Sequence, residues 1–460
     1  MALAAADYRK VLRHRPGLPE ACCNLGSVLL AEGQPDLSAA CLRRALAAIP
    51  QSAVAYANLG AAERGRDRPQ QALTALGRAL LLAADYANAA ISLGLVLQDL
   101  GRLDDAVALF RRAIALSPGP GLAHNNLGSL HYRCRRLEQA ADSLYRAVAV
   151  APEHAVAHVN LSAVLLTRGD LAAGFRENEW RWRMPMMQAG RQDDPAPLWT
   201  GEAGQGRTLL IQAEQGLGDT LQFCRYAPLA AARGWRVVLA VQPPLVRLLE
   251  GLPGVGRVVS WLAAAEPCHA RIPMMSLPHV FATRLDTIPA GAYLRVEPGA
   301  AEAWRRRLRD VPGPKVGVVW AGAPRPDPLC QAVDGRRSMR PEMLAPLLAC
   351  PGVRFFSLQK DGPPAPPALI DHMGEMADFA DTAALVSALD LVISVDTSMV
   401  HLAGAMGKPV WMLDRFDSCW RWLENRDDSP WYPTLRIFRQ PAPGDWPAVV
   451  ERVTTALAAL

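Results

Sequence analysis

The segment from residue 214 to residue 220 reads Glu-Gln-Gly-Leu-Gly-Asp-Thr and combines two glycines with a carboxylate. It lies between a short apolar run and a helical pattern, so we expect a tight turn with an exposed backbone at Gly216 and Gly218. Asp219 would project from a helix start, where the helix dipole keeps a carboxylate ionised. Such a carboxylate suits proton transfer; alternatively, Asp219 only caps its helix.

A second segment runs from Asp396 to residue 409 and reads Asp-Thr-Ser-Met-Val-His-Leu-Ala-Gly-Ala-Met-Gly-Lys-Pro. The pattern predicts a strand end, a turn and a helix start. Thr397 and Ser398 would present hydroxyl and backbone N–H groups there, which favours an anion site. His401 follows one turn later on the same face and can donate to a phosphate oxygen. The alternative is a purely structural turn in which Asp396 is a cap.

Three further positions are weaker candidates for contact with a phosphorylated ligand. Arg337 follows the loop after a predicted strand and suits a diphosphate clamp, although a solvated loop arginine is the alternative. Gln359 and Lys360 end another predicted strand, so nucleotide contact and solvation are both open. The aromatic segment 419–433 can stack on sugars or pack between domains.

The strands and helices predicted around these residues indicate an α/β region. Apolar runs at 208–212, 237–241 and 257–260 predict strands, with helices at 220–232 and 245–250. After a proline-rich break, further strands are predicted at 316–320, 354–358, 391–395 and 409–413, with helices at 341–349, 382–389 and 398–406. We therefore predict two Rossmann-like domains, 207–310 and 311–460, that face a cleft.

The region before residue 185 has a different character, because Asn-Leu-Gly recurs at 24–26, 58–60 and 126–128. Ser92-Leu93-Gly94 and Asn160-Leu161-Ser162 are near-copies in the same 34-residue register. Each period predicts two amphipathic helices that cross closely at a small residue (Ser38, Ala72, Ala106 and Ala140). This pattern resembles the tetratricopeptide repeat and predicts an α solenoid over 1–184, with about four full repeats and partial ends, then a connector over 185–206.

In tetratricopeptide repeats the first helix of each repeat lines the concave face. The resemblance therefore places one row of side chains there, at Asn24, Asn58, Ser92, Asn126 and Asn160. A carboxamide donates and accepts hydrogen bonds, so such an asparagine ladder can bind an extended peptide backbone, as in the repeat half of O-linked N-acetylglucosamine transferase. The alternative is that each asparagine packs within its own repeat.

Composition narrows the class of protein. Half of the 460 residues are hydrophobic, a fifth are charged, and the net charge is +5. No block of five lysines or arginines occurs, so nucleic-acid binding is not indicated. The nine scattered cysteines favour reduced thiols and a cytoplasmic protein. The short apolar N-terminus does not suggest a signal peptide, and no apolar stretch is long enough to span a membrane.

Together, the repeats, the segment around Asp219 and the segment after Asp396 resemble bacterial tetratricopeptide-repeat glycosyltransferases with a heptosyltransferase-like (family 9, GT-B) half. The resemblance implies transfer of a sugar from a nucleotide-sugar donor to an acceptor. Asp219 would be the general base of an inverting displacement, and the turn at Gly216 and Gly218 would approach the donor. Asp396, Thr397, Ser398, His401 and, less specifically, Arg337, Gln359 and Lys360 would complete the donor site.

The resemblance also implies no cofactor and no metal. The sequence contains no Asp-x-Asp, and a helix dipole with basic side chains can offset diphosphate charge. The acceptor would be a protein recruited by the repeats, with a flagellin-like protein as one candidate. Two alternatives remain open: an acceptor that is a lipid-linked or surface polysaccharide, and a non-catalytic scaffold with a vestigial transferase domain. A CMP-linked donor would bring one phosphate and change the diphosphate roles.

Overall fold

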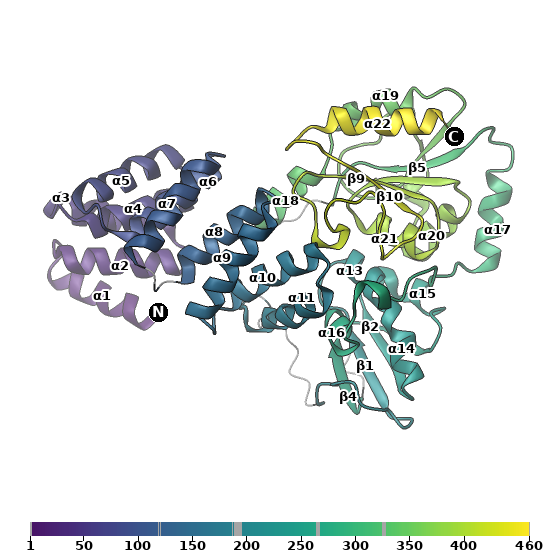
Figure 1. Cartoon of the computed structure of the whole chain (residues 1–460), viewed down its shortest axis with the longest axis horizontal. Helices are drawn as coiled ribbons and strands as arrows, with labels where there is room; N and C mark the ends of the chain where they lie inside the picture. The colour runs from purple at the N-terminus through teal and green to yellow at the C-terminus, as the bar shows by residue number, and fades with distance from the viewer. Residues whose placement is uncertain are drawn as a thin grey trace. The chain divides into compact units, whose positions relative to one another are not determined.

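The computed structural model describes residues 2–117, 119, 121–185, 187, 196–263, 267–323 and 328–459, and it forms two compact units (Figure 1). The first unit comprises Met1–Val164 and Trp180–Pro185, and the second comprises Leu165–Glu179 and Met186–Leu460. Residues 186 and 188–195 of the predicted connector 185–206 lie outside the described residues. Among the described residues, no helix is both long enough and apolar enough to cross a bilayer.

The first unit is an α solenoid of antiparallel helix pairs, as predicted (Figure 1). Its helices are α1 (Ala2–His14), α2 (Pro19–Ala31), α3 (Pro35–Ala48), α4 (Ala53–Gly65), α5 (Pro69–Leu82), α6 (Ala87–Asp99), α7 (Leu103–Leu116), α8 (Gly121–Arg133), α9 (Leu137–Val150) and α10 (Ala155–Arg168), of which α10 runs into the second unit. The even-numbered helices are the first helices of the repeats.

The glycine of each repeat tripeptide makes room for a large side chain from the second helix. A Cβ atom at Gly60 would lie 2.4 Å from Cγ of Leu76, and one at Gly94 would lie 2.6 Å from Cε1 of Phe110. Leu76 and Phe110 are both fully buried. The predicted small residues at the crossing are buried as well, and Ser38 Oγ donates to the carbonyl oxygen of Gly26 (2.7 Å). The Asn-Leu-Gly signature therefore marks close helix packing.

The second unit contains two parallel sheets, which confirms the predicted α/β character. The first sheet has the order β3-β2-β1-β4, with β1 Thr208–Gln212, β2 Arg236–Val241, β3 Val255–Ser260 and β4 Ala270–Pro273. The second has the order β10-β9-β8-β5-β6-β7, with β5 Lys315–Val319, β6 Arg354–Ser357, β7 Ile370–Asp371, β8 Leu391–Val395, β9 Val410–Asp414 and β10 Leu435–Arg439.

The helices of the second unit lie between and after the strands of both sheets, apart from α11, which precedes β1 (Figure 1). They are α11 (Leu171–Asn178), α13 (Leu217–Phe223), α14 (Ala227–Ala232), α15 (Val246–Leu249), α16 (Leu277–Val280), α17 (Pro298–Arg307), α18 (Pro328–Arg337), α19 (Ala345–Leu348), α20 (Phe379–Ser387), α21 (Ser398–Ala405) and α22 (Trp446–Ala458). Buried side chains from α11, both sheets and α21 share one hydrophobic core, so these elements pack as one body.

The predicted helix over 220–232 is wrong in two respects. The helix begins earlier, at Leu217, and a 3-10 turn over Cys224–Tyr226 separates α13 from α14. Pro228 lies in the first turn of α14 and cannot donate a backbone hydrogen bond to the preceding turn, which explains the break. Because of the earlier start, Gly218 and Asp219 lie in the first turn of α13. Similarly, the predicted helix over 341–349 is a 3-10 turn, Pro341–Leu344, followed by α19.

Candidate functional site

The two segments that contain the candidate base and the candidate anion site are in contact in the structure. α13 follows the carboxyl end of β1, and α21 follows the carboxyl end of β8. Their first turns are in contact, since a Cβ atom at Gly218 would lie 3.5 Å from Cα of Ser398 and 2.8 Å from Cδ2 of His401. Gly218 is therefore the position where one helix start approaches the other. Ligands of α/β folds bind at this edge, beyond the carboxyl ends of the strands.

Asp219 has two partners within this site. Its Oδ2 atom accepts a hydrogen bond from the backbone N–H of Gly216 (2.9 Å), which stabilises the start of α13. Its Oδ1 atom accepts a charge-assisted hydrogen bond from Arg421, which follows β9. Asp219 therefore does cap its helix, as the alternative interpretation expected, and this cap uses only its Oδ2 atom. A carboxylate offers about four lone-pair positions, so these contacts leave acceptor capacity.

Arg421 is held on several sides. Its Nε atom donates to Oε1 of Gln222 (2.7 Å), and its guanidinium lies 4.4 Å from the ring centroid of Trp420. Burial acts to lower the pKa of Arg421, but the charge of Asp219 and the nearby Cys419 raise it above the usual value. The guanidinium is therefore a fixed positive charge beside Asp219.

His401 is buried and neutral. Its Nδ1 atom lies 2.9 Å from the hydroxyl of Tyr432, and its ring stacks on Trp422 at a centroid distance of 5.4 Å. Burial, together with the positive charges of Arg421, Arg225 and Arg337, lowers the pKa of His401 well below its usual value. The imidazole therefore carries one ring proton at neutral pH, and its other ring atoms face Gly218.

The start of α21 is capped by its own residues. Thr397 is the N-cap, and its Oγ1 accepts a hydrogen bond from the N–H of Met399 (3.3 Å). Arg337, at the end of α18, donates to the carbonyl oxygen of Asp396 (3.0 Å) and pairs with Asp334 (2.6 Å). Its buried Nε atom has no hydrogen-bond partner among the described residues. Arg337 therefore contacts the residue before this helix start, and its predicted role as a diphosphate clamp stays a prediction.

Gln359 is half-buried and Lys360 is exposed, and the side chains of both bind backbone groups that follow the strands of the second sheet. Oε1 of Gln359 accepts from the N–H groups of Trp320 (3.3 Å) and Ala321 (3.0 Å), directly after β5. Lys360 Nζ donates to the carbonyl oxygens of Met373 (3.2 Å) and Met376 (2.5 Å). These bonds hold loops in place, and a role in nucleotide binding stays a prediction for both residues.

The aromatic segment packs inside the second unit. Trp422, Trp431 and Tyr432 are fully buried. Arg225 donates to the carbonyl oxygen of Trp431 (2.7 Å) and to the hydroxyl of Tyr293 (3.0 Å), while its guanidinium lies 4.6 Å from the ring centroid of Tyr432. The segment thus joins α13 and its neighbours to the second sheet. This packing agrees with the structural alternative rather than with sugar stacking by these three rings.

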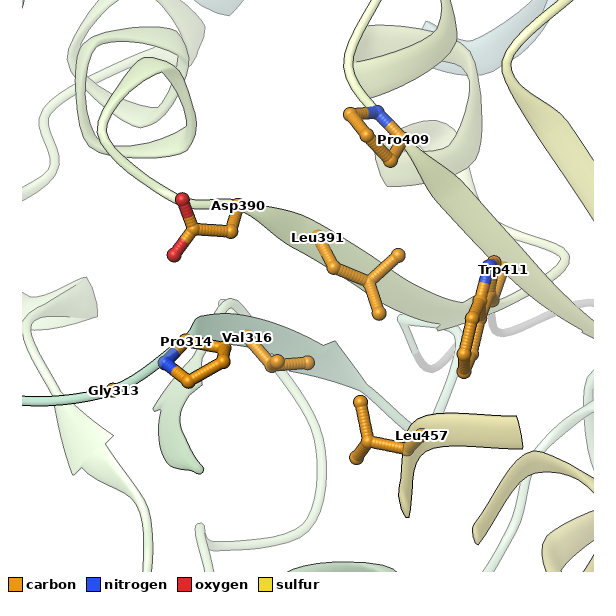
Figure 2. Close-up of a pocket in the computed structure, with 8 residues that line it drawn as sticks. All are labelled: Gly313, Pro314, Val316, Asp390, Leu391, Pro409, Trp411 and Leu457. Carbon is orange, nitrogen blue, oxygen red and sulfur yellow. The ribbon is translucent and has the colours of Figure 1, made fainter. Parts of the chain in front are cut away.

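A cavity of about 500 Å³ (Figure 2) lies at the amino ends of the strands of the second sheet, whereas α21 begins at the carboxyl end of β8. Its lining is largely apolar and comes from the amino ends of β5, β8 and β9 and from α22. The lining residues are Gly313, Pro314, Val316, Asp390, Leu391, Pro409, Trp411 and Leu457. The residues discussed above lie at the carboxyl edge, so the cavity is distinct from the candidate site. Among the described residues, no cluster of three metal-ligating side chains was found.

The asparagine ladder lies in the first helices of the repeats, and two of its members connect neighbouring repeats. Asn58 Nδ2 donates to Ser27 Oγ in the preceding repeat (2.8 Å), and Asn160 Nδ2 donates to Asn125 Oδ1 in the preceding repeat (2.9 Å). Asn24 is exposed, and Ser92 and Asn126 are partly exposed. Packing within one repeat is therefore not the arrangement at Asn58 or Asn160.

Sequence reasoning missed Arg421, Arg225 and Tyr432, which hold Asp219, α13 and His401. In the segment that contains Arg421 and Tyr432, the aromatic content was the only visible signal. Arg421 lies 202 residues from Asp219 in the chain, so no local spacing could reveal the pair.

Comparisons with known proteins agree with the solenoid. Residues 57–120 and 91–155 match one tetratricopeptide repeat model, and residues 19–52 match another. The chain is therefore a tetratricopeptide-repeat protein over this region, which supports a role in protein interaction. It is also similar to Protein FlbA of Caulobacter vibrioides (strain ATCC 19089 / CIP 103742 / CB 15), with 30% identity over 328 residues. That alignment covers 64% of this chain and 54% of the relative, so the chain spans about half of the relative's length.

Among the solved structures that resemble part of the chain are two with identities above 25%. The crystal structure of MamA is 29% identical, with a TM-score of 0.29, and the match covers 33% of this chain and 88% of that one. A thermophilic tetratricopeptide-repeat protein of Thermus thermophilus is 26% identical, with a TM-score of 0.33, over 35% of this chain and 89% of that one.

Proposed function

We propose that the second unit is a GT-B glycosyltransferase that moves a sugar from a nucleoside-diphosphate donor to an acceptor hydroxyl. The observation that carries this proposal is the contact between the first turns of α13 and α21 at Gly218 and Ser398. This contact brings the Asp219 carboxylate, which follows β1 of the first sheet, close to the N-terminus of α21, which follows β8 of the second sheet. Transfer from an anionic donor needs such a combination of a base and positive potential.

In this proposal Asp219 takes the proton from the acceptor hydroxyl. The oxygen attacks the anomeric carbon, the bond from that carbon to the diphosphate oxygen breaks, and the nucleoside diphosphate leaves with the electron pair. Because a single displacement occurs, the configuration at the anomeric carbon is inverted. The Oδ1 and Oδ2 contacts of Asp219 limit the rotation of its carboxylate, which supports a fixed position for a base.

The diphosphate would lie at the start of α21. Backbone N–H groups near Ser398 would supply hydrogen bonds, and the positive charges of Arg337 and Arg421 would offset the charge that develops on the leaving group. Neutral His401 adds no charge there; it can orient Gly218 and the helix start through packing. The tetratricopeptide repeats would recruit the acceptor, which we infer to be a protein.

Thermal unfolding of the full chain with UDP, GDP, ADP, dTDP and CMP tests the donor site. A ligand at about 100 times its dissociation constant adds roughly 2.7 kcal/mol to the unfolding free energy. One nucleoside diphosphate should raise the unfolding temperature of the second unit by a few degrees. No response to any nucleotide at millimolar concentration would favour a vestigial transferase domain, and a response to CMP alone would require a one-phosphate donor.

The acceptor class is tested separately. The responding donor, with a labelled sugar, is incubated with the full chain and a lysate of the source cells. Label in a protein band supports a protein acceptor. Label only in the lipid-linked or polysaccharide fraction supports the alternative acceptor and overturns the protein one.

A further inference from the structure

The cavity at the amino ends of the strands of the second sheet has a buried, apolar floor. It is formed by Val316 of β5, Leu391 of β8, Trp411 of β9 and Leu457 of α22 (Figure 2). All four side chains belong to one hydrophobic core. The cavity of about 500 Å³ therefore lies against a buried apolar surface, and its size is typical of small-molecule sites.

The rim of the cavity contains a single charged side chain. Its exposed residues are Gly313, Pro314, Asp390 and Pro409, and of the eight lining residues Asp390 alone is charged. The carbonyl oxygens of Pro314 and Pro409 already accept backbone hydrogen bonds (2.8 and 3.0 Å), and proline has no N–H group to donate. The Asp390 carboxylate is therefore the charged group that the cavity offers to a ligand.

The position of this carboxylate is fixed by β5. Oδ2 of Asp390 accepts a hydrogen bond from the backbone N–H of Lys315 (2.8 Å), and the backbone N–H of Asp390 donates to the carbonyl oxygen of Lys315 (2.9 Å). A carboxylate has about four lone-pair positions, so acceptor capacity remains. Figure 2 shows Asp390 on one side of the cavity and Trp411 on the other. A ligand that fits both sides has a cationic end and an apolar end.

Two helix ends add negative potential to the Asp390 side. α20 ends at Ser387, three residues before Asp390, and α22 ends at Ala458, next to Leu457. The carboxyl end of a helix carries a partial negative charge. Lys408 uses one of these ends, because its Nζ atom donates to the carbonyl oxygen of Ser387 (3.2 Å). An ammonium group is thus already bound at this edge of the sheet.

The positive charges of the chain leave the carboxylate available. Burial lowers the pKa of Lys408, while the charge of Asp390 raises it. The guanidinium of Arg436 lies 5.9 Å from the ring centroid of Trp411, on the other side of the cavity. In the part of the chain that the structure describes, neither cation forms an ion pair with Asp390. A ligand cation would be attracted toward Asp390 and repelled from the Trp411 side by Arg436.

We propose that this cavity binds a small aromatic amine, with its ammonium group at Asp390 and its ring against Trp411. The ammonium group donates to the carboxylate, and the ring buries apolar surface against the indole and Leu457. A ligand carboxylate or phosphate would be repelled by Asp390 and by the helix ends, and a neutral ligand would cover the carboxylate without pairing it. The proposal does not depend on sugar transfer.

Three indoles that differ in one group test the charge preference. Tryptamine has an ammonium group, tryptophol a hydroxyl and indole-3-propionate a carboxylate on the same ring. Ligand-observed NMR titration of the full chain, without nucleotide, measures the three dissociation constants. Tryptamine should bind at least about tenfold more tightly than tryptophol, and indole-3-propionate more weakly than tryptophol. Equal affinities for tryptamine and tryptophol, tighter binding of the carboxylate, or no binding of tryptamine at millimolar concentration overturns the proposal.

Asp390→Asn locates the cationic end of the ligand. Asparagine can still accept the hydrogen bond from Lys315 but has no charge. Tryptamine should bind this variant about tenfold more weakly, whereas the affinity for tryptophol should stay within about twofold of the wild type. The matched control is Asp142→Asn, which removes an exposed carboxylate of α9 and should change neither affinity. Equal weakening of tryptamine in both variants, or in neither, contradicts the location.

Leu457→Trp locates the aromatic end. The larger ring occupies part of the cavity and should weaken tryptamine and tryptophol alike. Leu457→Met has nearly the volume of the wild type and should bind both compounds normally. Circular dichroism shows whether each variant is folded. Unchanged affinities in folded Leu457→Trp would place the ring elsewhere and overturn the proposal. If Leu457→Trp does not fold, Asp390→Asn decides the proposal, because it retains the bond to β5.

Discussion

Asp219 and Arg421 form an ion pair that joins the first turn of α13 to the segment after β9. Their side chains are 20% and 12% exposed, so the pair is largely removed from solvent. The pair connects the two sheets of the second unit at the edge where a donor and an acceptor would have to meet. It can therefore serve both stability and chemistry, and substitutions can separate the two roles.

Replacing Arg421 with methionine should destabilise the second unit. The change leaves the Asp219 carboxylate without its charged partner and removes the bond to Gln222. Breaking a buried ion pair by removing one partner costs about 3–5 kcal/mol. Urea unfolding of the full chain, followed by intrinsic tryptophan fluorescence, measures the loss.

Arg426→Met is the matched control for that experiment. Arg426 pairs with Asp428 two residues away, and the side chains are 31% and 66% exposed. An exposed pair contributes about 1 kcal/mol or less. Equal losses for the two variants would show that the Asp219–Arg421 pair does not stabilise the contact between the sheets.

Asp219→Asn should abolish most sugar transfer even at temperatures where the variant is folded, although it also removes the charged partner of Arg421 and lowers stability. An asparagine oxygen can still accept the hydrogen bond from Gly216, but it cannot take up the acceptor proton. The transfer rate should fall by about 10²–10⁴-fold, with donor affinity little changed. Initial rates with labelled donor, measured well below the unfolding temperature, provide the readout. A rate within threefold of the wild type would exclude Asp219 as the base, and Asp428→Asn controls for the loss of a surface carboxylate.

The sequence was most informative where a pattern is local. β1 and β8 lie where predicted, because each is a short apolar run bounded by polar or glycine residues. The 34-residue period likewise predicts the solenoid, since every repeat needs the same close glycine contact. β4, by contrast, has four residues and contains Arg271, so its apolar pattern is too short to detect.

The candidate site was only partly predictable. The segments around Asp219 and Thr397 are recognisable because glycine, hydroxyl and carboxylate residues follow predicted strands. Their contact, and the roles of Arg421 and Tyr432, depend on long-range packing that no spacing in the sequence encodes. The burial of His401 also follows from this packing. The spacing of His401 from Thr397 predicted which face of the helix the residue occupies. It could not predict that the ring is neutral.

Gly60→Ala and Gly77→Ala should change stability in opposite directions. A Cβ atom at Gly60 would lie 2.4 Å from the buried Leu76 Cγ, so the repeat must shift, at a cost of about 1–3 kcal/mol. Gly77 lies within α5 and has open space at that position, so alanine should stabilise the helix by about 0.5–1 kcal/mol. Circular dichroism during thermal unfolding measures both changes. Two changes of the same sign would contradict the close-packing role of the Asn-Leu-Gly glycine.

His401 should make the second unit less stable in mild acid. Burial and the guanidinium groups of Arg421, Arg225 and Arg337 hold its pKa in the folded state well below the unfolded value of about 6.5. Below pH 6.5 the unfolded chain therefore binds a proton that the folded chain does not. The associated stability is complete above pH 6.5 and is lost as the pH falls, with a slope of at most about 1.4 kcal/mol per pH unit for one proton.

The comparison of wild type with His401→Gln isolates this contribution, because all other titrating groups are common to both chains. Glutamine can retain a hydrogen bond to Tyr432 but does not titrate. The unfolding free energy, measured by urea titration between pH 7.5 and pH 5, should fall less steeply for His401→Gln than for the wild type. The exposed His279→Gln should keep the wild-type slope. Parallel curves for wild type and His401→Gln would mean that His401 protonates in the folded chain. The conclusion that a neutral ring lies beside Gly218 would then be wrong.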